Sequence, residues 1–224
     1  MRYAVYAVPG IGDNSANSAT ALRDTAASWF ARADMRDITT EPRRYGFHAT
    51  LKAPFRPASG ITQETVIDAV AAFARTHDPV TLRDLRPAAL GEFRALVPHG
   101  RTDGVDALAA ATVRELDHLR APMTAAERTR RRPELLSATQ AGLLDRWGYP
   151  YVMAEFAVHL TLTNALRGTR IPEVDSAIAA HFAAVTGADV AITALTVCAE
   201  PEPGADFHPL HVQPLRSTIA TPTL

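Results

Sequence analysis

The sequence has 224 residues, of which 47% are hydrophobic, and its formal net charge at pH 7 is -1. This size suits one large domain or two small lobes around a shared core, and the charge gives no bulk electrostatic reason to expect nucleic acid or an anionic membrane as a partner. The single cysteine, Cys198, excludes an intrachain disulfide and a cysteine-rich zinc site. No stretch approaches the ~20 apolar residues of a membrane span, and the first residues are too short an apolar run for a secretory signal, so we expect a cytoplasmic location.

The first half of the chain alternates between strand and helix patterns. Apolar residues recur with a period of two in the predicted strands and at helical spacing in the predicted helices. Pro54 ends one strand, and Thr62 is the predicted N-cap of the helix that follows. In chain order we predict a strand at 2–8, a helix at 19–33, a strand at 46–55, a helix after 62, and strands near 80–85 and 88–97.

The middle of the chain, 103–147, is predicted to be helical. Asp103 can cap a first helix, Thr124 and Glu127 have the spacing of a capping box, and Pro133 suits the first turn of a third helix. The first pattern then returns, with a strand at 157–166, a helix opened by Pro172, and strands near 190–199 and 207–215. Because strand, helix, strand, strand occurs twice, we predict an internal duplication joined by the helical middle.

The central strand of each half carries His-x-Thr-Leu. The two copies are His48-Ala49-Thr50-Leu51 and His159-Leu160-Thr161-Leu162, and their histidines are 111 residues apart. One such motif would be weak evidence, whereas two at matching places of a repeat are specific. Since side chains alternate between the faces of a strand, each histidine shares a face with the threonine two residues later. We therefore expect both pairs to line one groove between the halves.

Two facing imidazoles and two hydroxyls suit phosphodiester hydrolysis without a metal. Histidine titrates near neutrality, so one neutral imidazole can accept a proton from water while an imidazolium donates one to the leaving oxygen. Threonine hydroxyls can donate to the non-bridging phosphate oxygens, whose charge grows in the transition state. No acidic cluster of the metal-ligand type adjoins either motif, so we predict His48, Thr50, His159 and Thr161 as catalytic residues and expect no metal and no cofactor.

The paired motifs resemble those of the 2H phosphoesterase superfamily, and their context resembles the branch encoded in bacterial phosphonate-utilisation operons. The similar segments are YGFHATLKAPF (45–55), APMTAAERTRRRPELL (121–136), WGYPYV (147–152) and FAVHLTLT (156–163), which with RYAVYAVP extend the resemblance over nearly the whole chain. The resemblance implies an α+β fold in which two pseudo-symmetric antiparallel-sheet lobes with outer helices surround a central cleft. We expect one bilobed domain over 1–224, with lobe one at about 1–100, a helical connection at about 101–148 and lobe two at about 149–224.

Further residues are candidates for substrate binding. Lys52 has the strand parity of His48 and Thr50, and the repeat places it opposite Thr163, so we predict that both contact phosphate. Tyr45 precedes the first motif and is a candidate contact. In the arginine-rich run 128–132, Arg131 and Arg132 are the preferred ligands of a second anionic group, because guanidinium forks onto phosphate oxygens.

Two further positions bear on phosphate binding and on metal binding. The resembling branch has an arginine just before the second motif, where this chain has Ala157, so one phosphate contact is either absent or supplied elsewhere. His208 and His211 are a close pair, but their spacing in a strand puts them on opposite faces, so they are not predicted to bind metal.

The leading hypothesis is an enzyme that opens a cyclic phosphodiester of a small phosphorylated substrate, and the family context points to a ribose cyclic phosphate in phosphonate metabolism. An enzyme acting on RNA 2′,3′-cyclic phosphate ends is the alternative, which needs a basic track and stacking aromatics. A non-catalytic module that binds nucleotide or phosphate on the same fold is the second alternative. The oligomeric state stays open.

Overall fold

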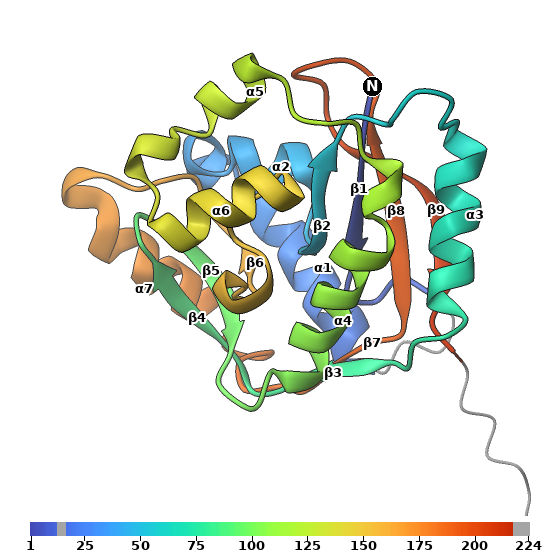
Figure 1. The fold of residues 1–224 in the computed structure, drawn as a ribbon. Helices are drawn as coiled ribbons and strands as arrows, with labels where there is room; N and C mark the ends of the chain where they lie inside the picture. The colour runs from blue at the N-terminus through green and yellow to red at the C-terminus, as the bar shows by residue number, and fades with distance from the viewer. Residues whose placement is uncertain (13–16, 217–224) are drawn as a thin grey trace, which may run out of the picture.

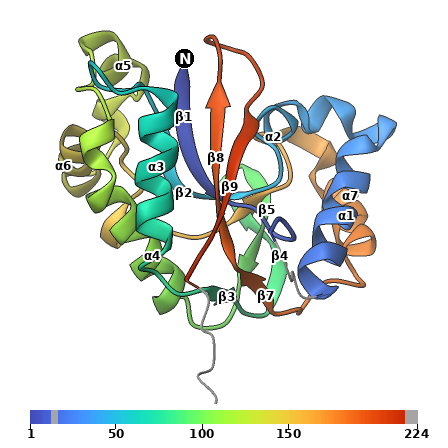
Figure 2. The same ribbon diagram turned by 90° about the vertical axis from the view of Figure 1, so that its right-hand side faces the viewer.

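Antiparallel sheets organise the chain in the computed structural model, which describes residues 1–12 and 17–216. In these residues the strands form a four-stranded sheet ordered β2-β1-β8-β9, a three-stranded sheet ordered β4-β5-β6, and a two-stranded sheet of β3 and β7 (Figures 1 and 2). The strands are β1 (Arg2–Ala7), β2 (Ala49–Phe55), β3 (Val80–Leu82), β4 (Leu85–Leu90), β5 (Phe93–Pro98), β6 (Leu160–Thr161), β7 (Val190–Ile192), β8 (Ala194–Glu200) and β9 (His208–Pro214).

The helices lie outside the sheets, to either side of the four-stranded sheet in the view of Figure 2. The α-helices are α1 (Asn17–Ala31), α2 (Thr40–Tyr45), α3 (Gln63–Ala74), α4 (Asp103–Glu115), α5 (Ala125–Arg130), α6 (Ala138–Trp147) and α7 (Ile171–His181). Short 3₁₀ turns are η1 (Ala33–Ile38), η2 (Asp117–Leu119), η3 (Pro133–Leu135), η4 (Met153–Glu155) and η5 (Gly168–Arg170). None of the helices in the described ranges is both long and apolar enough to cross a membrane.

Each of the two larger sheets takes strands from both halves of the sequence. The hairpin of β8 and β9, from the second half, pairs with β1 and thereby with β2 of the first half. The hairpin of β4 and β5, from the first half, pairs with β6 of the second half. The sheets therefore do not follow the sequence blocks 1–100 and 149–224 that we expected as lobes. Equal spacing reveals the repeated order of elements, but it cannot show that the two halves exchange their C-terminal hairpins.

The core is apolar on the helix-facing side of the four-stranded sheet. Tyr3, Val5 and Ala7 point into it from β1, while Leu51 and Phe55 do so from β2, and all five are at most 4% exposed. The indole N–H of Trp29 in α1 donates to the carbonyl oxygen of Leu162, the residue after β6, at 3.0 Å. Burial of such side chains contributes about 1.5–3 kcal/mol each, so the strands that carry the motifs are held by the core directly behind them.

The helix caps follow the local sequence closely. The hydroxyl of Thr62 accepts from the N–H of Thr65, and Thr124 and Glu127 form the complete capping box that the sequence predicts for α5. Asp103 is the first residue of α4 and not its cap, which is Thr102. Pro133 opens the separate turn η3, and α6 begins later, with its own capping box on Ser137.

The predicted strand 157–166 is regular only over Leu160–Thr161. Beyond it, the N–H groups of Leu162 and Thr163 both donate to the carbonyl of Arg94, and that of Asn164 donates to Ile38. The chain leaves the sheet at this point because its backbone donors find partners on other elements. The second motif is therefore held by one short strand and an irregular segment whose N–H groups are bonded.

Candidate active site

Both motif histidines lie just before a strand and are held by the same backbone contact. The Nδ1 atom of His48 is 2.9 Å from the carbonyl oxygen of Gly46, and that of His159 is 2.8 Å from the carbonyl oxygen of Ala157. A carbonyl can only accept, so each Nδ1 carries a proton and donates it. Each Nε2 is consequently the atom that can exchange a proton with a ligand.

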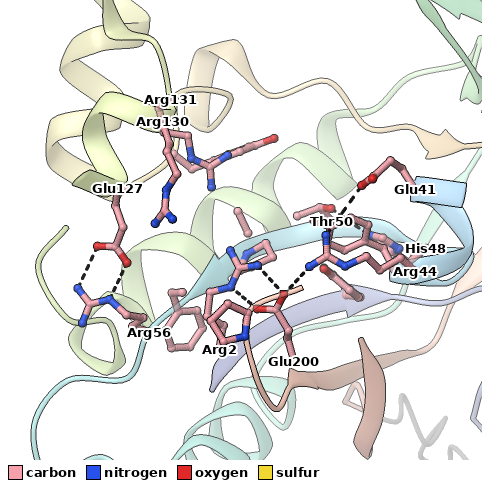
Figure 3. Close-up of a pocket in the computed structure, with 18 of the residues that line it drawn as sticks. Arg2, Glu41, Arg44, His48, Thr50, Arg56, Glu127, Arg130, Arg131 and Glu200 are labelled. Atoms are coloured by element: carbon pink, nitrogen blue, oxygen red, sulfur yellow. Dashed lines mark hydrogen bonds and ion pairs between the residues drawn. The ribbon is translucent and has the colours of Figure 1, made fainter. Parts of the chain in front are cut away.

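The two motifs meet on one cleft with a cavity volume of about 760 Å³. His48 and Thr50 reach it from the four-stranded sheet, and His159 and Thr161 from the three-stranded sheet. Figure 3 shows His48 and Thr50 together with the charged residues that line the same space. The structure thus brings the four predicted catalytic residues together, while their catalytic roles stay a prediction.

His48 is enclosed by its neighbours. Its ring stacks on the phenol ring of Tyr6, with centroids 3.7 Å apart and an angle of 20° between the planes. Its Nε2 lies 3.1 Å from the hydroxyl oxygen of Thr50. Burial lowers the pKa of His48 to about 4, which the hydrogen bond to Gly46 opposes and the positive charge of His159 reinforces. His48 is therefore neutral at pH 7.

His159 has a more open setting. Its ring lies 5.6 Å from that of Phe93, at a tilt of 51°. Within the described part of the chain, neither its Nε2 nor the hydroxyl of Thr161 hydrogen-bonds to another protein group. Both groups line the cleft and can be used by a ligand.

Lys52 does not lie on the cleft, so the strand-parity prediction is wrong for this residue. Val5 of β1 pairs with Lys52 of β2, but the next residue, Tyr6, pairs with Thr50. One residue of β1 therefore faces two residues of β2 at this point, which is a β-bulge. The bulge turns Lys52 toward α4, where it is 3% exposed and its ammonium group lies 3.3 Å from the carbonyl oxygen of Val113.

The surroundings of Lys52 are those of a buried structural charge. Its Nζ lies 3.5 Å from a carboxylate oxygen of Asp117. Burial lowers the pKa of Lys52 to about 8, although Asp117 opposes the shift. This position leaves no contact between Lys52 and the space that His48 and His159 share.

Thr163 and Tyr45 do line the cleft, but both are engaged by the protein. The Thr163 hydroxyl accepts from the N–H of Arg94 at 2.9 Å and donates to the carbonyl of Asn164 at 2.8 Å. The Tyr45 ring stacks on Phe207, with centroids 5.1 Å apart. Thr163 is therefore a backbone anchor of the second motif, and Tyr45 forms part of the wall.

The arginine run contributes Arg130 and Arg131 to the cleft, and not Arg132. Arg131 lies over the ring of Tyr149, 5.1 Å from its centroid. Arg130 and Arg131 extend from α5 toward β2 (Figure 3), and no carboxylate of the described chain pairs with either. Arg132 follows the end of α5 in a left-handed conformation (φ 48°) and is exposed outside the cleft, so that preference is corrected to Arg130.

Sequence reasoning missed a charged cluster at the other end of the cleft. Arg2 forms two hydrogen bonds to the Glu200 carboxylate, at 2.5 and 2.9 Å, and Arg44 adds a third at 2.5 Å. Burial would raise the pKa of Glu200, but Arg2, the N–H of Gly204 and Arg44 outweigh it and hold the pKa at about 2. Strand alternation does put Arg2 and Tyr6 on the same face of β1. Nothing in the sequence, however, identifies β8 as the strand that pairs with β1.

The acidic groups in the described ranges form no metal-binding cluster of three or more His, Cys, Asp or Glu. Ala157 lines a second, apolar cavity of about 310 Å³ that opens beside His159. The position of the missing arginine is thus occupied by apolar surface. Arg2, Arg44, Arg130 and Arg131 are arginines of this chain that can face an anion in the cleft instead.

A bilobed α+β fold with one His-x-Thr segment on each side of a cleft is the arrangement that the resemblance to the 2H phosphoesterase superfamily implies, and the predicted fold class is confirmed. The crystal structure of TT0787 of Thermus thermophilus has the same fold, with a TM-score of 0.54 and 14% identity over 97% of this chain and all of that one. Residues 50–208 match the family described as "Protein of unknown function (DUF1045)", and the chain belongs to that family.

Two curated relatives carry the same name, "Ribose 1,5-bisphosphate phosphokinase PhnN". The protein of Janthinobacterium sp. (strain Marseille) is 41% identical over 177 residues, which are 77% of this chain and 39% of the relative. The protein of Laribacter hongkongensis (strain HLHK9) is 39% identical over 216 residues, or 92% of this chain and 50% of the relative. The chain therefore spans half or less of the length of these relatives.

Proposed function

We propose that this chain is a phosphoesterase that hydrolyses a small cyclic phosphodiester, with His48 and His159 as its acid–base pair. One observation carries the proposal: both imidazoles line the same cleft, and both keep Nε2 as the atom that exchanges a proton, because both Nδ1 atoms donate to backbone carbonyls. A phosphate between them would meet a proton acceptor on one side and a proton donor on the other.

The reaction balances with these two groups alone. A water oxygen attacks phosphorus while a neutral imidazole takes one of its protons, and the P–O bond on the opposite side breaks. The imidazolium gives its proton to that leaving oxygen, so a cyclic diester becomes a phosphomonoester and a free hydroxyl. The hydroxyls of Thr50 and Thr161 line the same space. Thr161 can donate to a non-bridging oxygen as its charge grows, and Thr50 can do so once the attacking water replaces it as the donor to Nε2 of His48.

The substrate that fits best carries a second anionic group. Arg130 and Arg131 bring two positive charges to the cleft that no carboxylate of the described chain neutralises. Guanidinium binds phosphate oxygens with two parallel N–H groups, and desolvation in a cleft strengthens the contact. A ribose with one cyclic phosphate and one further phosphate satisfies both sites, in line with a role in phosphonate metabolism.

The relatives' name favours a ribose phosphate as well. Opening the cyclic phosphate of a ribose that carries a second phosphate yields a ribose bisphosphate, which is the class of compound in that name. The kinase activity in the name does not suit this chain. Its only lysine, Lys52, follows Leu51, so the Gly-Lys of a P-loop is absent from the sequence.

A screen of cyclic phosphates read by phosphorus NMR tests the proposal. The panel holds ribose cyclic phosphates with and without a second phosphate, nucleoside 2′,3′-cyclic phosphates, and a short RNA with a 2′,3′-cyclic end, each with and without excess EDTA. We expect conversion to phosphomonoester with the ribose compounds, unaffected by EDTA. Replacing His48 or His159 by Ala should lower kcat roughly 10²–10⁴-fold. Near-normal turnover of both variants, or loss of activity in EDTA, would contradict the mechanism.

A further inference from the structure

The two motifs match in sequence, but the structure surrounds their histidines differently. Tyr6, 1% exposed, covers one whole face of His48, with ring centroids 3.7 Å apart. The aromatic ring beside His159, that of Phe93, is tilted and lies at 5.6 Å. An imidazole that is covered on one face cannot be hydrated there, and hydration is what stabilises its charged form.

The hydrogen bonds of the two histidines also favour a neutral His48 over a neutral His159. The Nδ1 of His48 donates to Gly46, so in the neutral ring Nε2 is an acceptor, and the Thr50 hydroxyl at 3.1 Å donates to it. The hydroxyl shows that Nε2 of His48 is set up to accept a hydrogen bond, and an attacking water can replace the hydroxyl as the donor to the same lone pair. The Thr161 hydroxyl makes no such bond to His159 in the part of the chain that the structure describes.

We infer that His48 is the proton acceptor of the pair and His159 the proton donor, and that Tyr6 is the positioning residue that fixes this division by covering the His48 ring. The inference rests on the proposed phosphodiester hydrolysis. In that reaction, His48 receives the proton of the attacking water and His159 protonates the leaving oxygen. The low pKa of His48, about 4, agrees with this order, since a group that is neutral at pH 7 can only accept.

Other charges around the cleft do not reverse the assignment. Glu200 is compensated by Arg2 and Arg44, and Glu41 pairs with Arg44 at 4.0 Å, so two guanidinium groups face two carboxylates and this cluster brings no net negative charge that would favour imidazolium at His48. The attraction of a cation to the face of Tyr6 favours imidazolium, but it is the smaller effect for a ring held out of water. The titratable or charged side chains on the cleft walls are Arg2 and Tyr6 of β1, Glu41, Arg44 and Tyr45 of α2, Arg56, Arg120, Glu127, Arg130, Arg131, Tyr149, His159 and Glu200.

Leaving-group rescue distinguishes donor from acceptor. The paired substrates are an alkyl cyclic phosphate and a p-nitrophenyl phosphodiester, whose nitrophenolate departs without needing a proton. We expect His159→Gln to lose at least tenfold less activity on the nitrophenyl ester than on the alkyl ester, about the scale of one proton transfer. His48→Gln should lose the same factor on both, because water must be deprotonated in either case. The opposite pattern, or equal losses for both variants, overturns the assignment.

A titration by NMR tests the role of Tyr6 without relying on turnover. Imidazole carbon-bound protons of the eight histidines are followed with pH, and His48 and His159 are assigned from their Gln variants. We expect His48 to titrate below about pH 5 in the wild type and in Tyr6→Phe, which keeps the ring. In Tyr6→Ala, water reaches the imidazole and the midpoint should rise by about one pH unit or more.

Tyr6→Val, whose side chain suits a strand, is the second variant if Tyr6→Ala does not fold. The inference is overturned if His48 of the wild type titrates at the ordinary histidine value. It is also overturned if the titration midpoint of His48 moves in neither Tyr6→Ala nor Tyr6→Val. A wild type that hydrolyses neither ester shows instead that the proposed function is wrong. In that case the NMR midpoint still decides whether Tyr6 keeps His48 neutral, so the two failures are distinguishable.

Discussion

Arg56 and Glu127 tie the end of the first motif strand to the helix that carries the cleft arginines. The guanidinium of Arg56 donates to both carboxylate oxygens of Glu127, at 2.6 and 3.0 Å, and Glu127 also closes the capping box of α5. The hydrogen bond from Arg56, the largest of its stabilising contacts, holds the pKa of Glu127 at about 2. The position of Arg130 and Arg131 over the cleft therefore depends on one carboxylate.

Glu127→Ala should raise KM more than it lowers kcat. Loss of the cap weakens α5 by about 1 kcal/mol, and loss of the ion pair frees the helix from β2. Steady-state kinetics on the best cyclic phosphate measure the effect, and Asp145→Ala is the matched control, because Asp145 pairs with Arg128 of the same helix on the exposed side. Equal rises in KM for both variants would argue that α5 is merely destabilised.

Charge removal within the arginine run should discriminate between neighbouring positions. Arg131→Gln should raise KM for a substrate with a second phosphate roughly 10–100-fold, since a charge-assisted hydrogen bond contributes about 1.5–3 kcal/mol. Arg132→Gln should leave KM near the wild-type value, because Arg132 lies outside the cleft. The comparison is repeated with a cyclic phosphate that lacks the second phosphate, for which Arg131→Gln should have little effect. A similar loss on both substrates would contradict the second anion site.

The motif residues could be predicted from the sequence because strand alternation is local. His48 and Thr50 share the cleft as expected, and so do His159 and Thr161. The prediction for Lys52 failed because a bulge depends on the partner strand, which the sequence of β2 does not specify. The exchange of hairpins between the sheets could not be predicted either, because local sequence patterns do not show which strands pair.

The cluster around Glu200 was missed for the same reason. Arg2, Arg44 and Glu200 come from β1, α2 and β8, and they meet only through the pairing of β1 with β8. A glutamate followed by the turn sequence Pro-Glu-Pro-Gly is typical of the solvated end of a strand. Its side chain is nevertheless 1% exposed, because two guanidinium groups replace its water.

Lys52→Met should now affect the pH dependence of stability and not catalysis. The folded pKa of about 8 lies below the ordinary lysine value of 10.5, so the unfolded chain binds more protons between these values. Stability from this residue therefore rises as pH increases from about 8 to 10.5. Urea unfolding at about pH 7.5, 9 and 10.5 should show that rise in the wild type and its absence in the variant, with kcat/KM changed less than about threefold. A large rise in KM would restore Lys52 as a phosphate ligand.

Glu200→Gln should be among the most destabilising single changes in the chain. It removes the buried carboxylate from two partly exposed guanidinium groups, and since breaking a fully buried charge pair costs about 3–5 kcal/mol, we expect a loss of stability that approaches this range. In the wild type the depressed pKa of Glu200 stabilises the fold above the unfolded value, and this contribution is lost as pH falls from about 4.5 to about 2. Acid unfolding followed by circular dichroism should show a smaller pH dependence in that window for Glu200→Gln. An unchanged acid transition would show that the cluster does not couple to folding.

The three cleft threonines should separate into two kinds when each is replaced by Val. Thr161 makes no hydrogen bond within the described chain, so its hydroxyl is available to the substrate, and its loss should lower kcat about 10- to 100-fold with little change in stability. Thr50→Val should act similarly and should also remove the bond to Nε2 of His48, so that the low-pH limb of kcat/KM moves.

Thr163 differs because its hydroxyl bonds only to the backbone of Arg94 and Asn164. Thr163→Val leaves the Arg94 N–H unsatisfied and should cost about 1–3 kcal/mol of stability, while kcat in the remaining folded protein stays within a few-fold of wild type. Kinetics and urea unfolding on the three variants, which share the same loss of one hydroxyl, measure both quantities. If Thr161→Val loses stability and keeps its kcat, the second motif serves the fold and not the transition state.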